Sequence, residues 1–593
     1  MRVAALLAMT AISMFAQKPD TGQSVRGADD NATKPERPGG SAPPIKVTAR
    51  LVVLNVLVQD HSGHPVSGLS KDDFDVTDAN RQQTVKLFSA NHLATKAPGP
   101  APNALPRNIA TNRPLTQEGI PVGITVVLID QYNTNLMDQA YAKGQILKFL
   151  GSLEANQQVA LYTLTSKGLA IAHDFTNNAA SLWAAMTKMP SHLGRDLQAS
   201  SVDPANTGDE RLDQIIDKSN ALVAESFTKS RIVNTSAALK SLAGHLSGIP
   251  GRKSLVWITD GVPMQLFGDL EGLQSRPGGN PSAMPAQSLG RSGLDKQDLM
   301  LARDRSQLSF TSYIDDVCRT LNNANVAIYP VDARGLQTAP FTDASKNFKM
   351  DPTTHGLPNS AFQVDNRNTA TMNYLADMTG GKAFYNTNDI AEAARKVIND
   401  YSASYTLGYY VSASEWDNQY HKLKVSVRRP GVNVRTKRGY LAEDNPTPTG
   451  AQLEDTLKNA VWSPLDSTKL SVGARVDPSA TLPNASHFSF MIIPSEFNLR
   501  QENGRYTGAL DLLVIQLRKG GERSAEPKKT INLTLTPQRY QLMLQNGMLL
   551  TEDLTMYPDT VAVRIIFLDR ASGATGSLMM KIDPEDKSGP KQP

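Results

Sequence analysis

The chain of 593 residues is long enough for about four domains of average size, and its 40% apolar and 20% charged residues exclude both a wholly disordered chain and a protein with many membrane-spanning helices. Its 61 basic and 57 acidic residues give a net charge of +4, which provides no basic footprint for nucleic acid. Cys318 is the only cysteine, so the chain can form no intramolecular disulfide and no multi-cysteine metal site.

The N-terminal segment has the composition of an export signal. Arg2 precedes an apolar run at 3–16, and polar residues follow from Gln17. The run is too short to cross about 30 Å of hydrocarbon as a helix. One positive charge, a short apolar core and a small residue at its end are typical of a secretory signal peptide. We therefore expect a signal peptide at 1–16, a disordered leader at 17–45 and an exported protein, periplasmic or secreted; the alternative is a buried N-terminal helix.

Alternating patterns predict strands in two regions that are far apart in the sequence. Residues 46–90 alternate with a period of two and are rich in β-branched side chains, and the same period returns after residue 402. A segment of about 45 residues buries too little apolar surface to fold alone. We therefore predict one discontinuous β-sandwich formed by 46–92 and 403–440, with a linker at 93–119.

The middle of the chain alternates strands and helices. Apolar runs at 124–130, 254–260 and 326–332 are typical of strands that are buried on both faces of a parallel sheet. Repeated units of this kind predict an α/β fold with a doubly wound, mostly parallel sheet over 120–402. Further strands are expected at 158–164, 169–173 and 382–385. Polar insertions, expected as long surface loops with room for short helices, lie at 190–229, 264–304 and 335–369.

The C-terminal region returns to strand patterns after a linker at 441–452. Alternating or apolar runs lie at 509–517, 531–535 and 561–568. Spaced strands with turn signals between them predict a second β-sandwich at 453–582. Residues 583–593 are expected to form a disordered tail.

Four motifs occur in a fixed order along the chain. They are Leu-Ser-Lys-Asp-Asp-Phe at 69–74, Asp-Gln-Tyr-Asn-Thr at 130–134, Pro-Gly-Arg-Lys-Ser at 250–254 and Tyr-Thr-Leu-Gly-Tyr-Tyr at 405–410. Together they resemble the VWFA-related domain proteins of the acidobacterial type, which contain a von Willebrand factor type A (vWA) domain. The resemblance covers about 46–441, and 451–593 is similar to the β extension that some such proteins carry. It implies a Rossmann-like vWA domain with flanking all-β sandwich domains.

The resemblance also implies a metal-ion-dependent adhesion site above the carboxyl ends of the strands, where doubly wound folds place ligands. The family motif supplies hydroxyl and carboxylate oxygens to a divalent cation and leaves one position open for a partner's carboxylate. Asp130, Thr134 and Asp260 match this motif and are the expected ligands of Mg²⁺ or Ca²⁺. The site is degenerate, because Tyr132 replaces the middle Ser and Val233 stands where the ligand Thr aligns, so its affinity should be low. The alternative is that Asp130 and Asp260 cap helices and hold loops together.

Tyr132, Asn133 and Thr235 are the residues that we expect to contact a partner at this face, although Thr235 also fits a helix cap. The family then implies an exported protein that binds an unknown protein ligand, in adhesion or scaffolding, and that is not an enzyme. We expect no nucleic-acid partner and no transmembrane segment. The alternative is an envelope hydrolase with an unrecognised site in the insertions, although the sequence contains neither His-Glu-x-x-His nor Gly-x-Ser-x-Gly.

Overall fold

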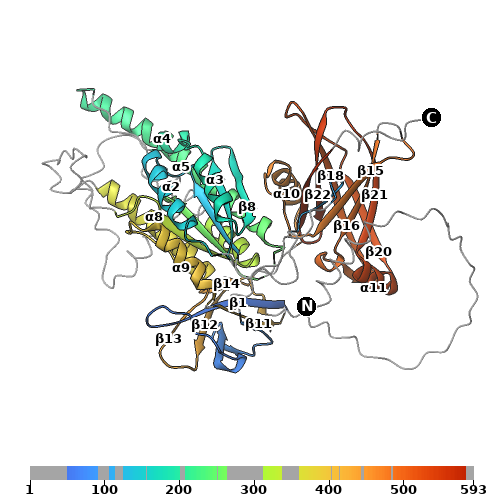
Figure 1. The fold of residues 1–593 in the computed structure, drawn as a ribbon, viewed down its shortest axis with the longest axis horizontal. Helices are drawn as coiled ribbons and strands as arrows, with labels where there is room; N and C mark the ends of the chain where they lie inside the picture. The colour runs from blue at the N-terminus through green and yellow to red at the C-terminus, as the bar shows by residue number, and fades with distance from the viewer. Residues whose placement is uncertain are drawn as a thin grey trace, which may run out of the picture.

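The chain forms an α/β unit with two β domains, one below it and one to its right in Figure 1. The computed structural model describes residues 50–90, 106–113, 124–154, 157–200, 207–249, 251–262, 312–336, 359–402, 404–412, 415–442, 447–482 and 485–582. The predicted signal peptide, leader, 264–304 insertion and tail lie outside the described residues. Among the helices that are described, none is long and apolar enough to cross a membrane. The prediction of an α/β unit with flanking β domains is confirmed.

A five-stranded mixed sheet forms the centre of the α/β unit, in the order β10-β9-β6-β7-β8. The strands are β6 (Ile124–Asp130), β7 (Gln158–Thr165), β8 (Gly168–Thr176), β9 (Lys253–Thr259) and β10 (Val326–Asp332). β10, β9, β6 and β7 run parallel, and β8 is antiparallel at one edge. Every residue of β6, β9 and β10 is buried, as expected for strands covered on both faces. The predicted strand at 382–385 is reduced to a single bridge between Phe384 and Val331.

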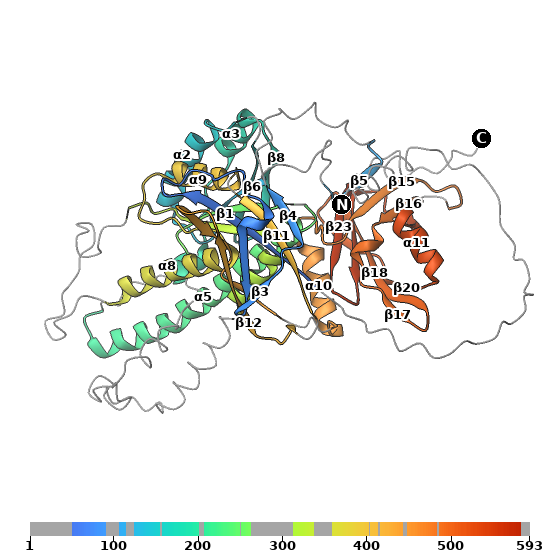
Figure 2. The ribbon, with the colours of Figure 1, turned by 90° about the horizontal axis from the view of Figure 1, so that it is seen from below.

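Helices cover both faces of this sheet, as Figures 1 and 2 show. One face packs against α5 (Glu210–Leu246), α8 (Asn359–Thr379) and a helix at 312–323, in a core that also buries the free thiol of Cys318. The other face packs against α2 (Leu136–Leu150), α3 (Ala179–Lys188) and α9 (Ile390–Ser402). The side chains of the sheet therefore alternate between two apolar cores.

Two helices extend into segments where the sequence predicts surface loops. α5 runs unbroken through much of the predicted 190–229 insertion, after α4 (Arg195–Ser200), and α8 begins inside the predicted 335–369 insertion. The first half of α5 leaves Ile215 66% exposed, so it lacks the buried apolar stripe that would have predicted a helix. Asp209 caps its first turn, and no Gly or Pro interrupts it before Gly244, which lets the helix continue into solvent.

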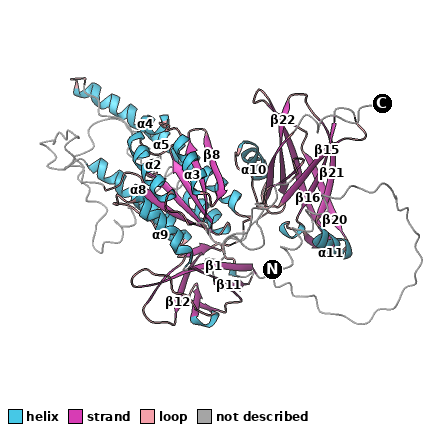
Figure 3. Cartoon of the chain, viewed as in Figure 1, coloured by secondary structure: helices cyan, strands magenta, loops and turns pink. Residues whose placement is uncertain are grey.

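Two four-stranded antiparallel sheets form the β domain that is split in sequence (Figure 3). Their orders are β13-β1-β11-β4 and β14-β12-β2-β3. The strands are β1 (Arg50–Asp60), β2 (Phe74–Asp78), β3 (Arg81–Gln83), β4 (Leu87–Ala90), β11 (Ser404–Val411), β12 (Tyr420–Val427), β13 (Val432–Arg435) and β14 (Gly439–Leu441). β1 pairs with β11 and β2 with β12, and one apolar core lies between the sheets. Segments on either side of the α/β unit therefore form one body.

The C-terminal β domain also contains two sheets around one core. The first sheet contains β15 (Val472–Pro478), β16 (Ala485–Ile492) and β21 (Met548–Thr555). The second contains β17 (Arg500–Glu502), β18 (Arg505–Arg518), β19 (Arg523–Ala525), β20 (Lys529–Leu535), β22 (Thr560–Asp569) and β23 (Thr575–Lys581). α11 (Pro537–Asn546) precedes β21, and α10 (Gly450–Trp462) packs Leu453 and Leu457 against the outer side of β22. α10 begins within the predicted 441–452 linker, where Thr449 caps it.

The predicted linker at 93–119 contains a strand of the C-terminal domain. β5 (Ile109–Thr111) pairs with β15 at the edge of the first sheet. Next to it, the buried side chain of Asn112 donates hydrogen bonds to the carbonyl groups of Ser467 and Leu470, at 2.8 Å each, and accepts one from the backbone N–H of Val472. Three residues are too few to show a period, so the sequence pattern does not reveal this strand.

Candidate functional site

The residues predicted as metal ligands converge at the carboxyl ends of β6 and β9. Asp130 ends β6, Thr134 lies in the loop between β6 and α2, and Asp260 directly follows β9. All three side chains are buried, and the Thr134 hydroxyl accepts a hydrogen bond from the backbone N–H of Asp260 at 3.2 Å. The structure therefore brings the three predicted ligands to one end of the sheet.

Both carboxylate oxygens of Asp130 accept hydrogen bonds from protein groups. Oδ1 accepts from the backbone N–H of Asn133 at 3.0 Å. Oδ2 accepts from the Asn133 side-chain amide at 2.8 Å, from Trp257 Nε1 at 3.1 Å and from the Thr259 hydroxyl at 2.9 Å. Complete burial still raises the pKa of Asp130, because desolvation outweighs these stabilising bonds. Asp130 is the centre of a closed hydrogen-bond network.

Arg231 on α5 brings a positive charge to this network. Its Nε donates to the Asn133 side-chain oxygen at 2.9 Å, and a terminal nitrogen donates to the Ser200 hydroxyl at 2.9 Å. Burial lowers the pKa of Arg231, while the negative charges of Asp130 and Asp260 oppose that shift. Sequence reasoning missed this residue because no motif links it to 130–134. The available signal was its spacing, since Arg231 lies one helical turn before Thr235.

Asp260 has one carboxylate oxygen without a partner. Its Oδ2 accepts hydrogen bonds from the backbone N–H of Asn135 at 2.8 Å and from the Asn135 side chain at 3.1 Å. Its Oδ1 is buried and has no hydrogen-bond partner among the described residues. Burial raises the pKa of Asp260 well above its usual range, and the nearby charge of Asp138 adds to the effect. Burial therefore disfavours the charged form of this carboxyl group relative to an exposed aspartate.

A divalent cation does not fit this cluster as the side chains lie. A divalent cation needs several oxygen ligands, but of the Asp130 and Asp260 carboxylate oxygens only Oδ1 of Asp260 lacks a hydrogen bond to a described residue, and the guanidinium of Arg231 already supplies positive charge. Tyr132, which replaces a family Ser, donates its hydroxyl proton to Asp196 instead. Within the described ranges, no group of three or more His, Cys, Asp and Glu side chains could hold a metal ion. The geometry favours the alternative in which Asp130 and Asp260 hold loops together.

The three residues expected to contact a partner lie in the interior. Tyr132 is 1% exposed, and Asn133 and Thr235 are fully buried, with the Asn133 amide donating to the Thr235 hydroxyl at 2.9 Å. The chain at 190–200 covers them. Gly194 in this segment lies so close that a Cβ atom there would be 2.5 Å from the Tyr132 carbonyl oxygen. Contrary to expectation, these three side chains offer no surface to a partner.

An exposed apolar surface lies at the same end of the sheet. Met137 is 83% exposed on the first turn of α2, and Tyr141 follows it one turn later. The Tyr141 hydroxyl donates to the carbonyl of Asn388, whose side chain accepts from the backbone N–H of Leu336, itself 58% exposed. Asn388 thus joins the loop after β10 to α2. We call Met137, Tyr141 and Leu336 the α2 patch.

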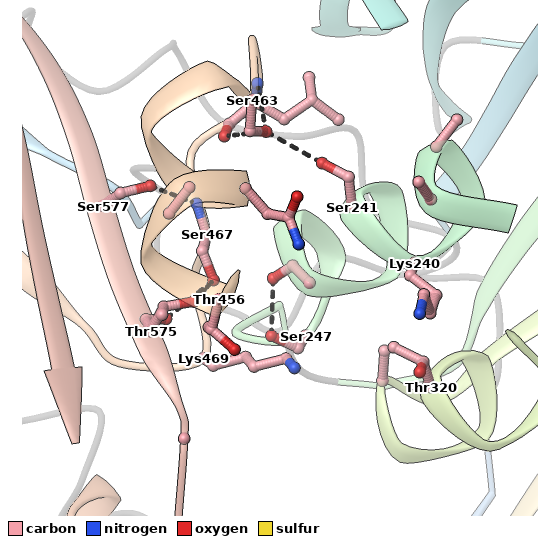
Figure 4. A pocket seen from close by; sticks show the side chains of 18 of the residues that line it. Lys240, Ser241, Ser247, Thr320, Thr456, Ser463, Ser467, Lys469, Thr575 and Ser577 are labelled. Carbon is pink, nitrogen blue, oxygen red and sulfur yellow. Dashed lines mark hydrogen bonds between the residues drawn. The ribbon is translucent and has the colours of Figure 1, made fainter. Parts of the chain in front are cut away.

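A second accessible site is a polar cleft between the α/β unit and the C-terminal β domain, with a volume of about 1760 Å³ (Figure 4). The end of α5 and the helix at 312–323 line one side, and α10 with the chain at 463–469 lines the other. Hydrogen bonds join the two sides. The Thr468 hydroxyl donates to the carbonyl of His245 and accepts from the backbone N–H of Gly248, at 2.7 Å each.

Comparisons with known proteins add little to this geometry. No protein-family model matches the sequence, and neither does any curated protein. Among solved structures, a similarity to the SpRpn10 VWA domain has 11% sequence identity and a TM-score of 0.19, over 46% of this chain and 93% of that chain. A similarity to the pilus adhesin SpaC from Lactobacillus rhamnosus GG has 9% identity and a TM-score of 0.24, over 78% and 54%. TM-scores of this size carry no argument about fold or function, and neither similarity bears on the resemblance to acidobacterial proteins.

Proposed function

We propose that the protein is an exported binding protein, acting in adhesion or scaffolding, whose doubly wound α/β unit is a vWA-type domain that holds a protein partner without a metal ion. The motifs at 130–134 and 250–254 support the family, and the apolar run at 3–16 supports export. The observation that carries the binding role is the α2 patch, because it lies at the end of the sheet where such folds place ligands.

The α2 patch has the composition of a protein-binding surface. Met and Tyr are enriched in the buried centres of protein interfaces, and exposed apolar clusters mark such sites. Burial of a side chain as large as Met137 or Leu336 by a partner would contribute about 1.5–3 kcal/mol. The closed network around Arg231 holds this surface in place, because Asp260 binds Asn135 directly before α2.

Capture of the partner from envelope extract by the immobilised full-length protein tests the site. Met137→Glu and Leu336→Glu should each reduce the captured amount about tenfold, since a charge cannot enter an apolar contact without loss of binding free energy. Leu549→Glu is the matched control, because Leu549 is as exposed as Leu336 but lies on β21 of the C-terminal domain. Equal capture by all three variants would reject the α2 patch as the binding site.

Two further measurements separate the parts of the proposal. Capture should be unchanged in EDTA, and a loss of capture that Mg²⁺ restores would show that a metal ion is needed after all. Cell fractionation should find the wild type outside the cytoplasm and a variant without residues 1–16 inside it. No observation on the described residues favours the hydrolase alternative.

A further inference from the structure

We propose that the cleft between the α/β unit and the C-terminal β domain binds an acidic polysaccharide, with Lys469 receiving its carboxylate groups. This site lies on the chain at 463–469 and is distinct from the α2 patch, so it gives the protein a second ligand of a different class. Three features of the cleft support this assignment, namely its size, its charges and the hydroxyl groups that line it.

The size of the cleft indicates an extended ligand. Its volume of about 1760 Å³ is larger than the roughly 300–1000 Å³ of typical small-molecule sites. Its lining comes from α5 and the helix at 312–323 on one side and from α10 and the chain at 463–469 on the other (Figure 4). Several consecutive units of a polymer therefore fit better than one metabolite.

The charges in the cleft favour an anionic ligand. Asp316 is paired with Lys240 at 2.5 Å and with Arg319, and Glu496 is paired with Arg113. Asp455, the third acidic residue that lines the cleft, lies 3.7 Å from the ammonium group of Lys458, so each acidic lining group has a basic partner. Lys469, by contrast, makes no hydrogen bond or ion pair with a residue that the structure describes, and Figure 4 shows its side chain extending across the cleft toward Lys240 and Thr320.

The positive charge of the Lys469 ammonium group is only partly offset by nearby negative charge. The side chain is exposed within the cleft, yet the walls displace enough water to lower its pKa. Lys240 and Arg319 lower it further as like charges, and Asp316 opposes them. A carboxylate placed beside Lys469 would accept a charge-assisted hydrogen bond from its ammonium group and offset the repulsion by Lys240 and Arg319.

The rest of the lining matches sugar units rather than a polypeptide. Lining hydroxyl groups such as those of Ser247, Thr320 and Thr456 donate their proton to a backbone carbonyl, so they remain able to accept the hydrogen bonds that sugar hydroxyls donate. Trp462 is 69% exposed at the cleft, and Arg523 lies over one face of its ring, 4.7 Å from the centroid. The other face is suited to the C–H surface of a sugar ring.

Isothermal titration calorimetry of the full chain with oligogalacturonate, neutral dextran and poly-glutamate tests the proposal. The wild type should bind oligogalacturonate, and binding should weaken as NaCl rises from about 0.05 to about 0.5 M. Lys469→Glu should reduce the affinity about tenfold or more, and Lys469→Arg should retain it, because a lost charged hydrogen bond has an effect of this size. Lys424→Glu is the control, since Lys424 is exposed on β12 and does not line the cleft.

Each result supports or overturns the proposal. The proposal is supported if the wild type binds oligogalacturonate but not dextran, and if Lys469→Glu weakens this binding while Lys424→Glu does not. Lack of oligogalacturonate binding by the wild type, or equal affinity of the wild type and Lys469→Glu, overturns it. Poly-glutamate binding as tight as oligogalacturonate would assign the cleft to acidic polypeptides instead. Equal thermal unfolding temperatures of the variants and wild type ensure that a loss of affinity does not come from unfolding.

Discussion

Arg231 is a buried charge whose partners are all protein groups. Its guanidinium donates to Asn133 and Ser200, and it supplies the positive charge that acts on Asp130. A buried charge left without its counterpart is strongly destabilising. Arg231→Met should therefore lower the free energy of unfolding by about 3 kcal/mol, measured by urea denaturation.

The same helix provides a control for this prediction. Arg211 lies on the first turn of α5, where it is exposed. Arg211→Met should change the free energy of unfolding by no more than about 0.5 kcal/mol, as surface substitutions usually do. If the Arg231 and Arg211 variants were equally stable, the guanidinium of Arg231 would not compensate the carboxylates around it.

Asp260 should make stability depend on pH. Its pKa is raised in the folded protein, mainly by burial, so the folded state binds this proton more tightly than the unfolded chain. The contribution to stability is full below the ordinary Asp pKa of about 3.9 and is lost as the pH rises through the folded pKa. Asp260→Asn should thus gain stability relative to wild type as the pH rises, as urea denaturation at several pH values would show. A difference that stays constant with pH would contradict the raised pKa.

At the scale of elements, the two glycines after α8 set how this helix meets β10. Gly380 has a φ of +77°, which ends the helix in the left-handed region, and a Cβ on Gly381 would lie 1.8 Å from the Ile328 carbonyl oxygen. Gly381→Ala must therefore displace α8 or β10, and we expect a loss of about 3 kcal/mol or more in the free energy of unfolding. Gly450→Ala is the control, because no atom lies within 4 Å of its added Cβ. Equal thermal unfolding temperatures of the two variants would reject this close contact.

The elements that the sequence predicts best are those whose residues are all buried. Strands such as β6 and β10 lie where continuous apolar runs predict them, because a strand covered on both faces needs apolar side chains at every position. β5 and the first half of α5 could not be found in this way. β5 has only three residues, and α5 extends past its apolar core as an exposed helix.

The sequence predicts where the candidate site lies, but it does not predict that the side chains of the site are buried and hydrogen-bonded to protein groups. The spacing of Asp130, Thr134 and Asp260 places them at one end of the sheet, as the structure does. The burial of Tyr132 beside them depends on the chain at 190–200, which contacts Tyr132 from a polar segment without periodicity. The positive charge of Arg231 comes from α5, which is distant in sequence from the motif at 130–134. Long-range contacts of this kind leave no pattern in the local sequence.

At the scale of the whole molecule, Asn112 fastens the segment before the α/β unit to the C-terminal β domain. Its side chain satisfies the carbonyl groups of Ser467 and Leu470 and the N–H of Val472. Asn112→Ala leaves these buried groups unpaired and should destabilise the C-terminal domain by about 2 kcal/mol. Hydrogen exchange of the amides in β15 should speed up accordingly. Arg107→Ala, at an exposed position two residues before β5, should leave this exchange unchanged.

The split pairing has a consequence for the order of events during biosynthesis. β1 and β5 are made early, but their partners β11 and β15 follow only after the whole α/β unit has been translated. Until then the nascent chain carries strands with unpaired backbone groups, which are open to wrong pairing with other chains. The domains of this protein therefore cannot fold one after another from the N-terminus. Both β domains can close only once most of the polypeptide exists, so a prematurely terminated chain would be prone to aggregation.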